Sequence, residues 1–118
     1  MNFKETKLKG CFIIEPKVIH DERGYFMESF NHNTFQNGVG QKVNFVQDNQ
    51  SFSSKGVLRG LHYDNKTWKL VQAAVGDIYL IVLDMRPTSD TFGEWESFMI
   101  TEKDRNQVLV PPGFANGH

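Results

Sequence analysis

Short apolar segments separated by turn-forming residues at nearly regular intervals are the feature that most constrains this chain. Pro16, Gly76-Asp77 and Pro111-Pro112-Gly113 each stand at the end or the start of such a segment. Proline cannot donate to a strand ladder and glycine favours turns, so these residues bound strands. Many short strands with turn signals every ~8–12 residues are typical of an antiparallel sandwich or barrel. The sequence therefore predicts an all-β fold.

Individual strands are predicted from the apolar pattern. Residues 78–85 are almost entirely apolar, as is typical of a strand buried on both faces. Further strands are predicted over residues 11–15, 25–30, 42–51, 70–75, 95–100 and 107–110. Residues 31–40 form the only plausible helical turn, which Asn31 or Asn33 caps at its start and Gly38 and Gly40 close at its end.

Length and composition predict a single domain over residues 1–118, since domains most often run ~100–150 residues. The net charge of -1, without a basic block, gives no sign of a nucleic-acid or membrane partner. No segment approaches the ~20 apolar residues of a membrane-spanning helix, and the start lacks the apolar core of a signal peptide. The single cysteine, Cys11, is interpreted as a small core residue and fits a reducing compartment. We expect a soluble, cytoplasmic protein.

Two apolar runs flank a polar turn at the centre of the chain. If residues 64–67 form a four-residue hairpin loop, His62 lies directly across from Lys69. Cross-strand partners share one face of a sheet, with Cβ atoms ~4.5–5.5 Å apart. A base that titrates near neutral pH then stands beside a cation, which suits proton transfer from a carbon acid. The alternative is an ordinary half-exposed histidine facing a lysine on a sheet surface.

Six sequence blocks follow one another along the chain. They are Glu22-Arg23-Gly24-Tyr25-Phe26-Met27-Glu28, Phe45-Val46-Gln47-Asp48-Asn49, Val57-Leu58-Arg59-Gly60-Leu61-His62-Tyr63, Lys69-Leu70-Val71, Thr91-Phe92-Gly93-Glu94-Trp95 and Pro111-Pro112-Gly113-Phe114-Ala115. From about Lys7 to the last residue, the chain resembles the dTDP-4-dehydrorhamnose 3,5-epimerase family. The resemblance implies a cupin-type jelly-roll that works as a homodimer without metal or organic cofactor. The implied reaction inverts C3 and C5 of a nucleotide-linked 4-keto-6-deoxyhexose, in the synthesis of surface polysaccharide sugars.

The residue types in these blocks suit that reaction. Protons at C3 and C5 are acidic because the C4 carbonyl can take the charge as an enolate, so a base and a donor or cation at the carbonyl oxygen are needed. The resemblance makes His62 the base and places Lys69 at the enolate oxygen. It also implies that Arg59 holds the diphosphate or orients the sugar. Strand parity puts Arg59 on the opposite face from His62, so both reach one pocket only if Gly60 marks a bulge. Further nucleotide-sugar contacts, some reaching the neighbouring subunit's pocket, are implied for Arg23, Glu28, Gln47 and Asn49.

The chain departs from the family pattern near its last residues. Where the rhamnose enzymes read Gly-Phe-Ala-His-Gly, this chain has Asn116 in place of the histidine, and His118 follows. The loop between His62 and Lys69 is also shorter than theirs. Both features resemble the epimerases that act on GDP-linked 4-keto heptoses in capsule synthesis, at C3, C5 or both. We expect Asn116 and His118, which share strand parity, to contact the substrate.

The family continues past this motif with a strand that bears a catalytic tyrosine and, later, an aspartate that pairs with the histidine. The three tyrosines of this chain, Tyr25, Tyr63 and Tyr79, do not match that position. Without the carboxylate His62 lacks the partner that fixes its tautomer, and without the tyrosine the second face of the sugar has no acid. We therefore expect the chain to be the N-terminal part of a longer enzyme, C-terminally truncated and with exposed strand edges.

Two other functions stay open at this point. A metal-binding cupin needs a His-x-His pair and a later histidine. This chain has His62-Tyr63-Asp64 and Asn116 at those positions, so no metal is expected. A non-catalytic nucleotide-sugar-binding or dimerisation module is the other alternative. Such a module would bind the sugar without exchanging its C3 or C5 protons.

Overall fold

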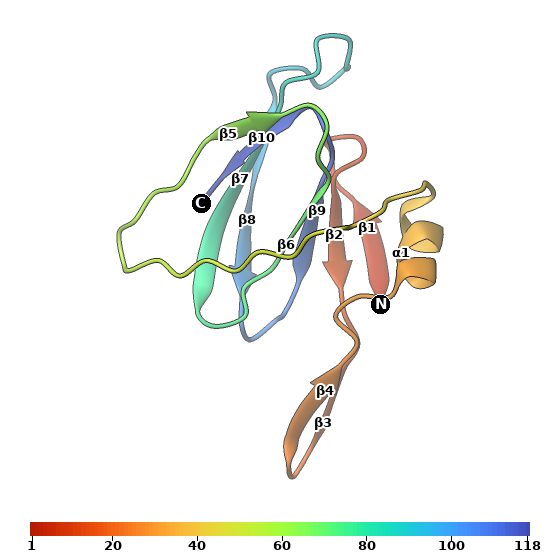
Figure 1. Cartoon of the computed structure of the whole chain (residues 1–118), viewed down its shortest axis with the longest axis vertical. Helices are drawn as coiled ribbons and strands as arrows, with labels where there is room; N and C mark the ends of the chain where they lie inside the picture. The colour runs from red at the N-terminus through yellow and green to blue at the C-terminus, as the bar shows by residue number, and fades with distance from the viewer.

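The computed structural model describes residues 1–118 and contains ten strands and one short helix (Figure 1). All strand pairs are antiparallel. The elements are β1 (Asn2–Glu5), β2 (Phe12–Glu15), β3 (Val18–Asp21), β4 (Gly24–Met27), α1 (His32–Val39), β5 (His62–Asp64), β6 (Lys69–Val71), β7 (Asp77–Asp84), β8 (Trp95–Thr101), β9 (Gln107–Val110) and β10 (Phe114–Gly117). The all-β prediction is confirmed.

The strands form two four-stranded sheets and one separate hairpin. The first sheet has the order β1-β2-β9-β6 and the second the order β5-β10-β7-β8. Strands β3 and β4 pair only with each other, and their hairpin extends away from the two sheets (Figure 1). Because consecutive strands such as β9 and β10 belong to different sheets, the chain passes repeatedly from one sheet to the other. This arrangement is the predicted cupin-type antiparallel sandwich.

The main core lies between the two sheets. Along β7, Leu80 and Val82 are buried while the alternate residue Tyr79 is exposed, as expected for a strand with one face inside. These side chains pack in one cluster with Val110 of the first sheet. The cluster also takes in Cys11, which has no exposed surface, so its interpretation as a core residue is confirmed. Burial raises the pKa of the Cys11 thiol to about 12.

A smaller core lies between the first sheet and α1. Asn31 caps the helix by accepting a backbone hydrogen bond in the first turn (3.1 Å), and Gly40 ends it in a left-handed conformation with φ 76°. Phe35 and Val39 lie one turn apart on the same face and pack against Leu109 of β9. The predicted helix is therefore confirmed. It is the only helix, and none is long and apolar enough to cross a membrane.

Two predicted features are wrong, for one shared reason. Residues 42–51 alternate like a strand but have no partner strand in the chain, and Val46 is 87% exposed. Residues 62–71 do not form a hairpin, because β5 pairs with β10 whereas β6 pairs with β9 in the other sheet. His62 is therefore not the cross-strand partner of Lys69. In both cases the local pattern identifies an extended segment, but the pairing depends on distant residues.

Candidate functional site

The two predicted catalytic residues lie on different sheets and are both neighbours of Asn116. His62 begins β5, and Asn116 of β10 lies directly across from it in the same sheet. Asn116 is also the partner of Val82, whose side chain belongs to the main core, so this face of the second sheet points inward. Lys69 begins β6 in the opposite sheet, and its Nζ donates a 2.9 Å hydrogen bond to Asn116 Oδ1. Asn116 therefore joins the histidine of one sheet to the lysine of the other.

Asp64 makes the turn that separates these two strands. Its Oδ1 accepts hydrogen bonds from the backbone N–H groups of Lys66 (2.6 Å) and Thr67 (3.0 Å), and its Oδ2 accepts one from Thr67 Oγ1 (2.8 Å). These hydrogen bonds lower the pKa of Asp64, and the bond from the Lys66 N–H has the largest effect. Such an Asx turn needs no strand pairing to be stable. The chain can therefore leave the second sheet after β5 and enter the first sheet at β6.

A buried polar cluster lies beside the start of β10 and was not anticipated from the sequence. The Asp84 side chain has no exposed surface. It accepts hydrogen bonds from Arg86 Nε (2.9 Å) and Nη2 (2.8 Å), Ser89 Oγ (2.6 Å) and Thr91 Oγ1 (2.6 Å). Burial opposes the charge on Asp84, but these hydrogen bonds outweigh it and lower the pKa of Asp84. The available signal was a carboxylate at the end of an apolar strand, followed within seven residues by an arginine, a serine and a threonine.

This cluster fixes the position of the strand that carries Asn116. The Arg86 guanidinium lies over the ring of Phe114, the first residue of β10, with 4.4 Å between its Cζ and the ring centroid. Arg86 Nη2 also donates to the carbonyl of Lys9 (2.9 Å). The N–H of Met85 donates to the carbonyl of Gly113 (3.0 Å), directly before the strand. The entry to β10 is thus held by both side-chain and backbone contacts.

Arg59 and Gly60 precede β5 and run beside the end of β10. Gly60 has φ 109°, and a Cβ there would stand 2.7 Å from the Cα of Gly117, so only glycine fits this close approach. The backbone departs from strand geometry at Gly60, which is the condition under which Arg59 and His62 were expected to reach one pocket. The Arg59 guanidinium donates to Ser53 Oγ (2.8 Å) and to the Phe52 carbonyl (3.0 Å). The structure thus ties Arg59 to the preceding segment, and none of its hydrogen bonds goes to Lys69 or Asn116.

His118 follows β10 and lines a different hollow. Its backbone exchanges two hydrogen bonds with Arg59, of 2.7 and 2.8 Å. His118 borders a pocket of about 590 Å³ between residues 53–61 and β7, which Tyr79 also lines. Neither His62, Lys69 nor Asn116 lines this pocket. His118 thus lines a pocket that Asn116 does not, and the prediction that both residues contact the substrate stays a prediction.

Arg23 and Glu28 lie outside the sandwich. Arg23 stands at the turn of the β3–β4 hairpin, where its Nη2 pairs with Asp21 Oδ2 at 2.6 Å. Glu28 follows the hairpin and accepts a hydrogen bond from Asn31 Nδ2 (3.2 Å). Since the hairpin extends away from the sheets (Figure 1), a single chain does not bring Arg23 to His62.

Gln47 and Asn49 lie on the unpaired segment between α1 and β5. Both are exposed, and Gln47 Nε2 donates to Asn49 Oδ1 (3.0 Å). The two amides therefore occupy one face of the segment, as their alternation predicts. No hydrogen bond joins them to His62 or Lys69, and the segment runs across the front of the first sheet in Figure 1.

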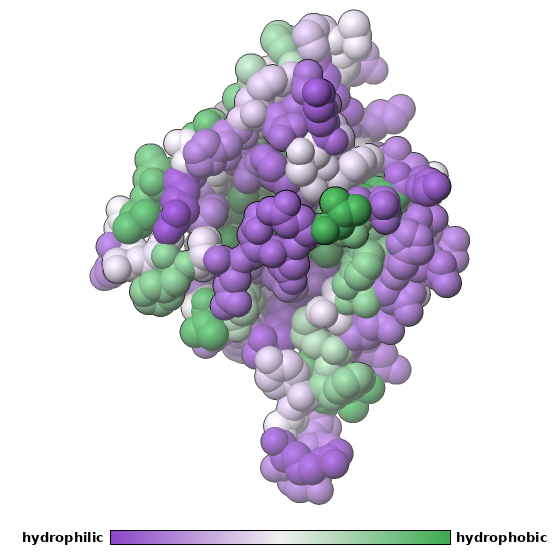
Figure 2. Space-filling model, viewed as in Figure 1, coloured by the Kyte–Doolittle hydropathy of each residue, from purple (hydrophilic) through white to green (hydrophobic).

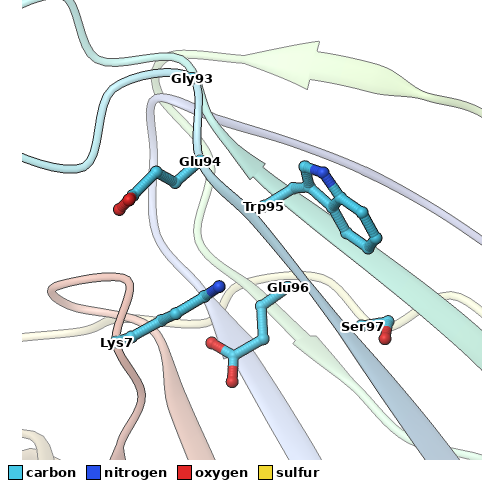
Figure 3. Close-up of a pocket in the computed structure, with 6 residues that line it drawn as sticks. All are labelled: Lys7, Gly93, Glu94, Trp95, Glu96 and Ser97. Atoms are coloured by element: carbon cyan, nitrogen blue, oxygen red, sulfur yellow. The ribbon is translucent and has the colours of Figure 1, made fainter.

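A second, shallow hollow of about 560 Å³ lies at the start of β8. Figure 3 shows Lys7 extending from the β1–β2 turn towards Glu96, while Trp95 points to the other side of the strand. The Glu96 Oε2 atom is buried without a hydrogen-bond partner. None of the predicted site residues lines this hollow. No group of three or more His, Cys, Asp or Glu side chains is placed to hold a metal ion anywhere in the chain.

Several large apolar side chains remain exposed. On the outer face of the second sheet, Tyr63, Tyr79, Trp95 and Met99 are each more than half exposed. The segment before β5 adds further apolar side chains, and Figure 2 shows hydrophobic groups over this segment at the left edge of the view. An exposed apolar surface of this extent is typical of a protein interface.

Comparison with known proteins gives a consistent result. The family model of dTDP-4-dehydrorhamnose 3,5-epimerase matches residues 5–118. The enzyme of that name from Shigella flexneri is 48% identical over 120 residues, covering 99% of this chain and 66% of the relative. The relative from Methanothermobacter thermautotrophicus is 48% identical over 117 residues, covering 98% and 63%. The crystal structure of dTDP-6-deoxy-D-glucose-3,5-epimerase from Legionella pneumophila, in complex with dTDP-4-keto-L-rhamnose, superposes with a TM-score of 0.93 at 42% identity, covering 98% of this chain and 63% of that one.

The chain therefore spans somewhat less than two thirds of the length of these relatives, 63 to 66%. The relatives are named for dTDP-linked sugars. The resemblance of Asn116 and the short loop to the GDP-heptose epimerases gains no support from them.

Proposed function

Because the chain belongs to the dTDP-4-dehydrorhamnose 3,5-epimerase family, we propose that it epimerises C3, C5 or both in a dTDP-linked 4-keto-6-deoxy sugar. The observation that carries this proposal is that Asn116 is the cross-strand partner of His62 and also accepts a hydrogen bond from Lys69 of the facing sheet. A base and a cation held on facing sheets are the two groups that enolate formation requires on one face of a sugar.

The proposed reaction begins with removal of a proton from the carbon next to the C4 carbonyl. The C–H bond breaks, His62 takes the proton, and the electron pair moves onto the carbonyl oxygen as an enolate. Lys69 stabilises that oxygen with its ammonium group, which is charged and carries three N–H donors. The enolate then collapses, and a new C–H bond forms with a proton delivered to the opposite face. No atom is gained or lost, so the product differs only in configuration.

The opposite face of the sugar needs its own proton donor. The family resemblance assigns this role to a tyrosine, and assigns orientation of the histidine to an aspartate, both at positions that follow His118. Neither Tyr63 nor Tyr79 matches that tyrosine, and both side chains lie on the outer face of the second sheet. We propose that inversion at the sugar carbon needs these two further residues, whereas removal of the first proton needs only His62 and Lys69.

The proposal is tested by isotope exchange. The protein is incubated in D2O with a dTDP-linked 4-keto-6-deoxy sugar, and the C3 and C5 proton signals are followed by NMR. We expect one or both signals to disappear. A matched dTDP-sugar with a hydroxyl at C4 should keep both signals, because without the carbonyl the neighbouring protons are not acidic. The GDP-linked keto sugar, run in parallel, decides between the two nucleotides.

Tight binding of the keto sugar without any exchange would contradict the proposal. That result would favour the non-catalytic binding module instead. Exchange that occurs equally with the C4-hydroxyl sugar would contradict the enolate mechanism.

We further propose that the protein acts as a homodimer. The support is the exposed apolar outer face of the second sheet and the unpaired extended segment at residues 42–51, which lack partners within one chain. A dimer would also explain how the projecting hairpin places Arg23 near a substrate, in the neighbouring subunit. Light scattering coupled to gel filtration should give twice the 13.6 kDa chain mass. The free, buried Cys11 fits our further proposal that the protein works in the cytoplasm.

A further inference from the structure

Asn116, which is expected to contact the substrate, also accepts a hydrogen bond from Lys69. Lys69 Nζ lies 2.9 Å from Asn116 Oδ1, and the two residues are 47 positions apart in the sequence. Both are half-buried, so the hydrogen bond is partly shielded from water. No other hydrogen bond or ion pair holds the lysine side chain within the chain.

The chemistry of lysine fixes which way the Asn116 amide points. An ammonium group can only donate, so the atom that faces Lys69 must be the carbonyl oxygen Oδ1. The amide nitrogen Nδ2 then points away from the lysine. Nδ2 donates to no other residue of the chain, and it is not among the buried polar atoms that lack a partner. It is therefore a free donor that remains accessible.

The register of the second sheet places this free donor beside the base. Asn116 is the direct cross-strand partner of His62, so the two side chains share the inward face. Opposed partners of this kind have Cβ atoms ~4.5–5.5 Å apart. The Asn116 amide thus stands beside His62, and the two remaining N–H groups of Lys69 lie next to the same amide.

We propose that Asn116 acts as a positioning residue for Lys69 and, through Nδ2, as a second donor to the oxygen that becomes the enolate. This inference rests on the proposed function. The amide accepts from the lysine on one side and donates to the substrate oxygen on the other. Because an amide does not titrate, this pair of donors keeps its hydrogen-bonding pattern whether His62 is neutral or has taken the substrate proton.

A histidine at this position would behave differently. Once protonated, it would carry only donors and a positive charge next to the lysine ammonium, so it could no longer accept from Lys69. The asparagine that this chain carries instead of the family's histidine avoids that conflict. Asn116 is therefore expected to determine how the lysine is held, and not merely to fill space.

Two variants separate the two roles. Asn116→Asp keeps an acceptor for Lys69 but removes the Nδ2 donor, whereas Asn116→Ala removes both. Asn37→Ala, an exposed asparagine on α1 without side-chain hydrogen bonds, is the matched control. Circular dichroism shows whether each variant is folded.

The positioning role is read from the lysine itself, without substrate. In protein labelled with 15N-lysine, ammonium protons give a signal only where a hydrogen bond slows their exchange with water, and the Lys69 signal is identified by its loss in Lys69→Arg. We expect the signal in the wild type, in Asn116→Asp and in the control, and its loss in Asn116→Ala. A Lys69 signal that survives in Asn116→Ala, or is missing from the wild type, overturns the positioning role.

The donor role is read from deuterium exchange at C3 and C5. Loss of one oxyanion donor lowers the rate constant by about 10²–10³-fold, so both Asn116 variants should fall by roughly 100-fold at saturating sugar, with little change in KM. Exchange by Asn116→Asp at the wild-type rate overturns the donor role. If the wild type exchanges nothing, the proposed function fails and the donor role with it, whereas the lysine signal still decides the positioning role.

Discussion

Replacement of Asp84 by alanine is expected to destabilise the fold strongly, because Asp84 holds the entry to the site strand. Its two carboxylate oxygens accept four side-chain hydrogen bonds and a fifth from the Arg86 N–H (3.0 Å). The Asp84 side chain has no exposed surface and that of Arg86 is 30% exposed. Asp84→Ala therefore leaves a partly buried guanidinium without its charge partner, and removes the acceptor shared by the Ser89 and Thr91 hydroxyls.

The size of the effect follows from this burial. Removing one partner of a buried ion pair costs about 3–5 kcal/mol, and the partial exposure of Arg86 places this case near the lower end. That is a large part of the ~5–15 kcal/mol by which a domain is stable. With a urea m-value of ~1–3 kcal/mol/M, a loss of ~3 kcal/mol lowers the midpoint of unfolding by roughly 1–3 M.

The chain supplies a matched control for this experiment. Asp21 and Arg23 have the same spacing as Asp84 and Arg86, and Asp21 also accepts from the backbone N–H of its arginine (2.8 Å). Their side chains are 39% and 83% exposed, so water can replace the lost contact. Urea unfolding followed by circular dichroism should show a lowered midpoint for Asp84→Ala and an unchanged one for Asp21→Ala. Equal midpoints for the two variants would refute the argument from burial.

Three further predictions concern Asp84, Cys11 and Gly60. The pKa of Asp84 is lowered in the folded state, so its contribution to the free energy of unfolding is present above its unfolded value of ~3.9 and is lost as the pH falls below that value. The difference in free energy of unfolding between wild type and Asp84→Ala should therefore become smaller in acid. A difference that becomes larger in acid would contradict the lowered pKa. Cys11 is buried and its pKa is raised to about 12, so it should not react with a thiol reagent at pH 8 until urea unfolds the chain. Fast reaction of the native protein would show that reagent reaches the core around Cys11. Gly60→Ala should cost about 1–3 kcal/mol and slow deuterium exchange, because a Cβ at φ 109° would press on Gly117 of the site strand; a variant with wild-type stability and rate would contradict the need for glycine.

The parts of the fold that depend on residues close together in the sequence were predictable. The helix is one example, since Asn31 and Gly40 cap it through contacts within one turn. The apolar run at residues 78–85 is another, because nearly every residue of a central strand must tolerate burial. The Asp64 turn also formed as its residue types indicate. In these cases the residue types determine the local geometry.

The pairing of the strands was not predictable in the same way. The Asp64 turn is compatible both with a hairpin and with a passage between sheets, and only β9 and β10, more than 35 residues further on, decide between them. The Lys69–Asn116 contact likewise depends on how the two sheets face one another. The predicted pairing of His62 with Lys69 across a turn is wrong. The structure instead links Lys69 to Asn116, the cross-strand partner of His62, through the packing of the two sheets.

The most direct test of the proposed function is the isotope exchange of a His62→Asn variant. Asparagine cannot take a proton at neutral pH, and His62 is exposed at the start of its strand, so the variant should fold. His32→Asn, at an exposed histidine of α1, is the control. With a dTDP-linked 4-keto-6-deoxy sugar in D2O, we predict exchange at C3 or C5 by the wild type and by His32→Asn, and none above the uncatalysed rate by His62→Asn. Undiminished exchange by His62→Asn would show that His62 is not the base, and would contradict the proposed mechanism.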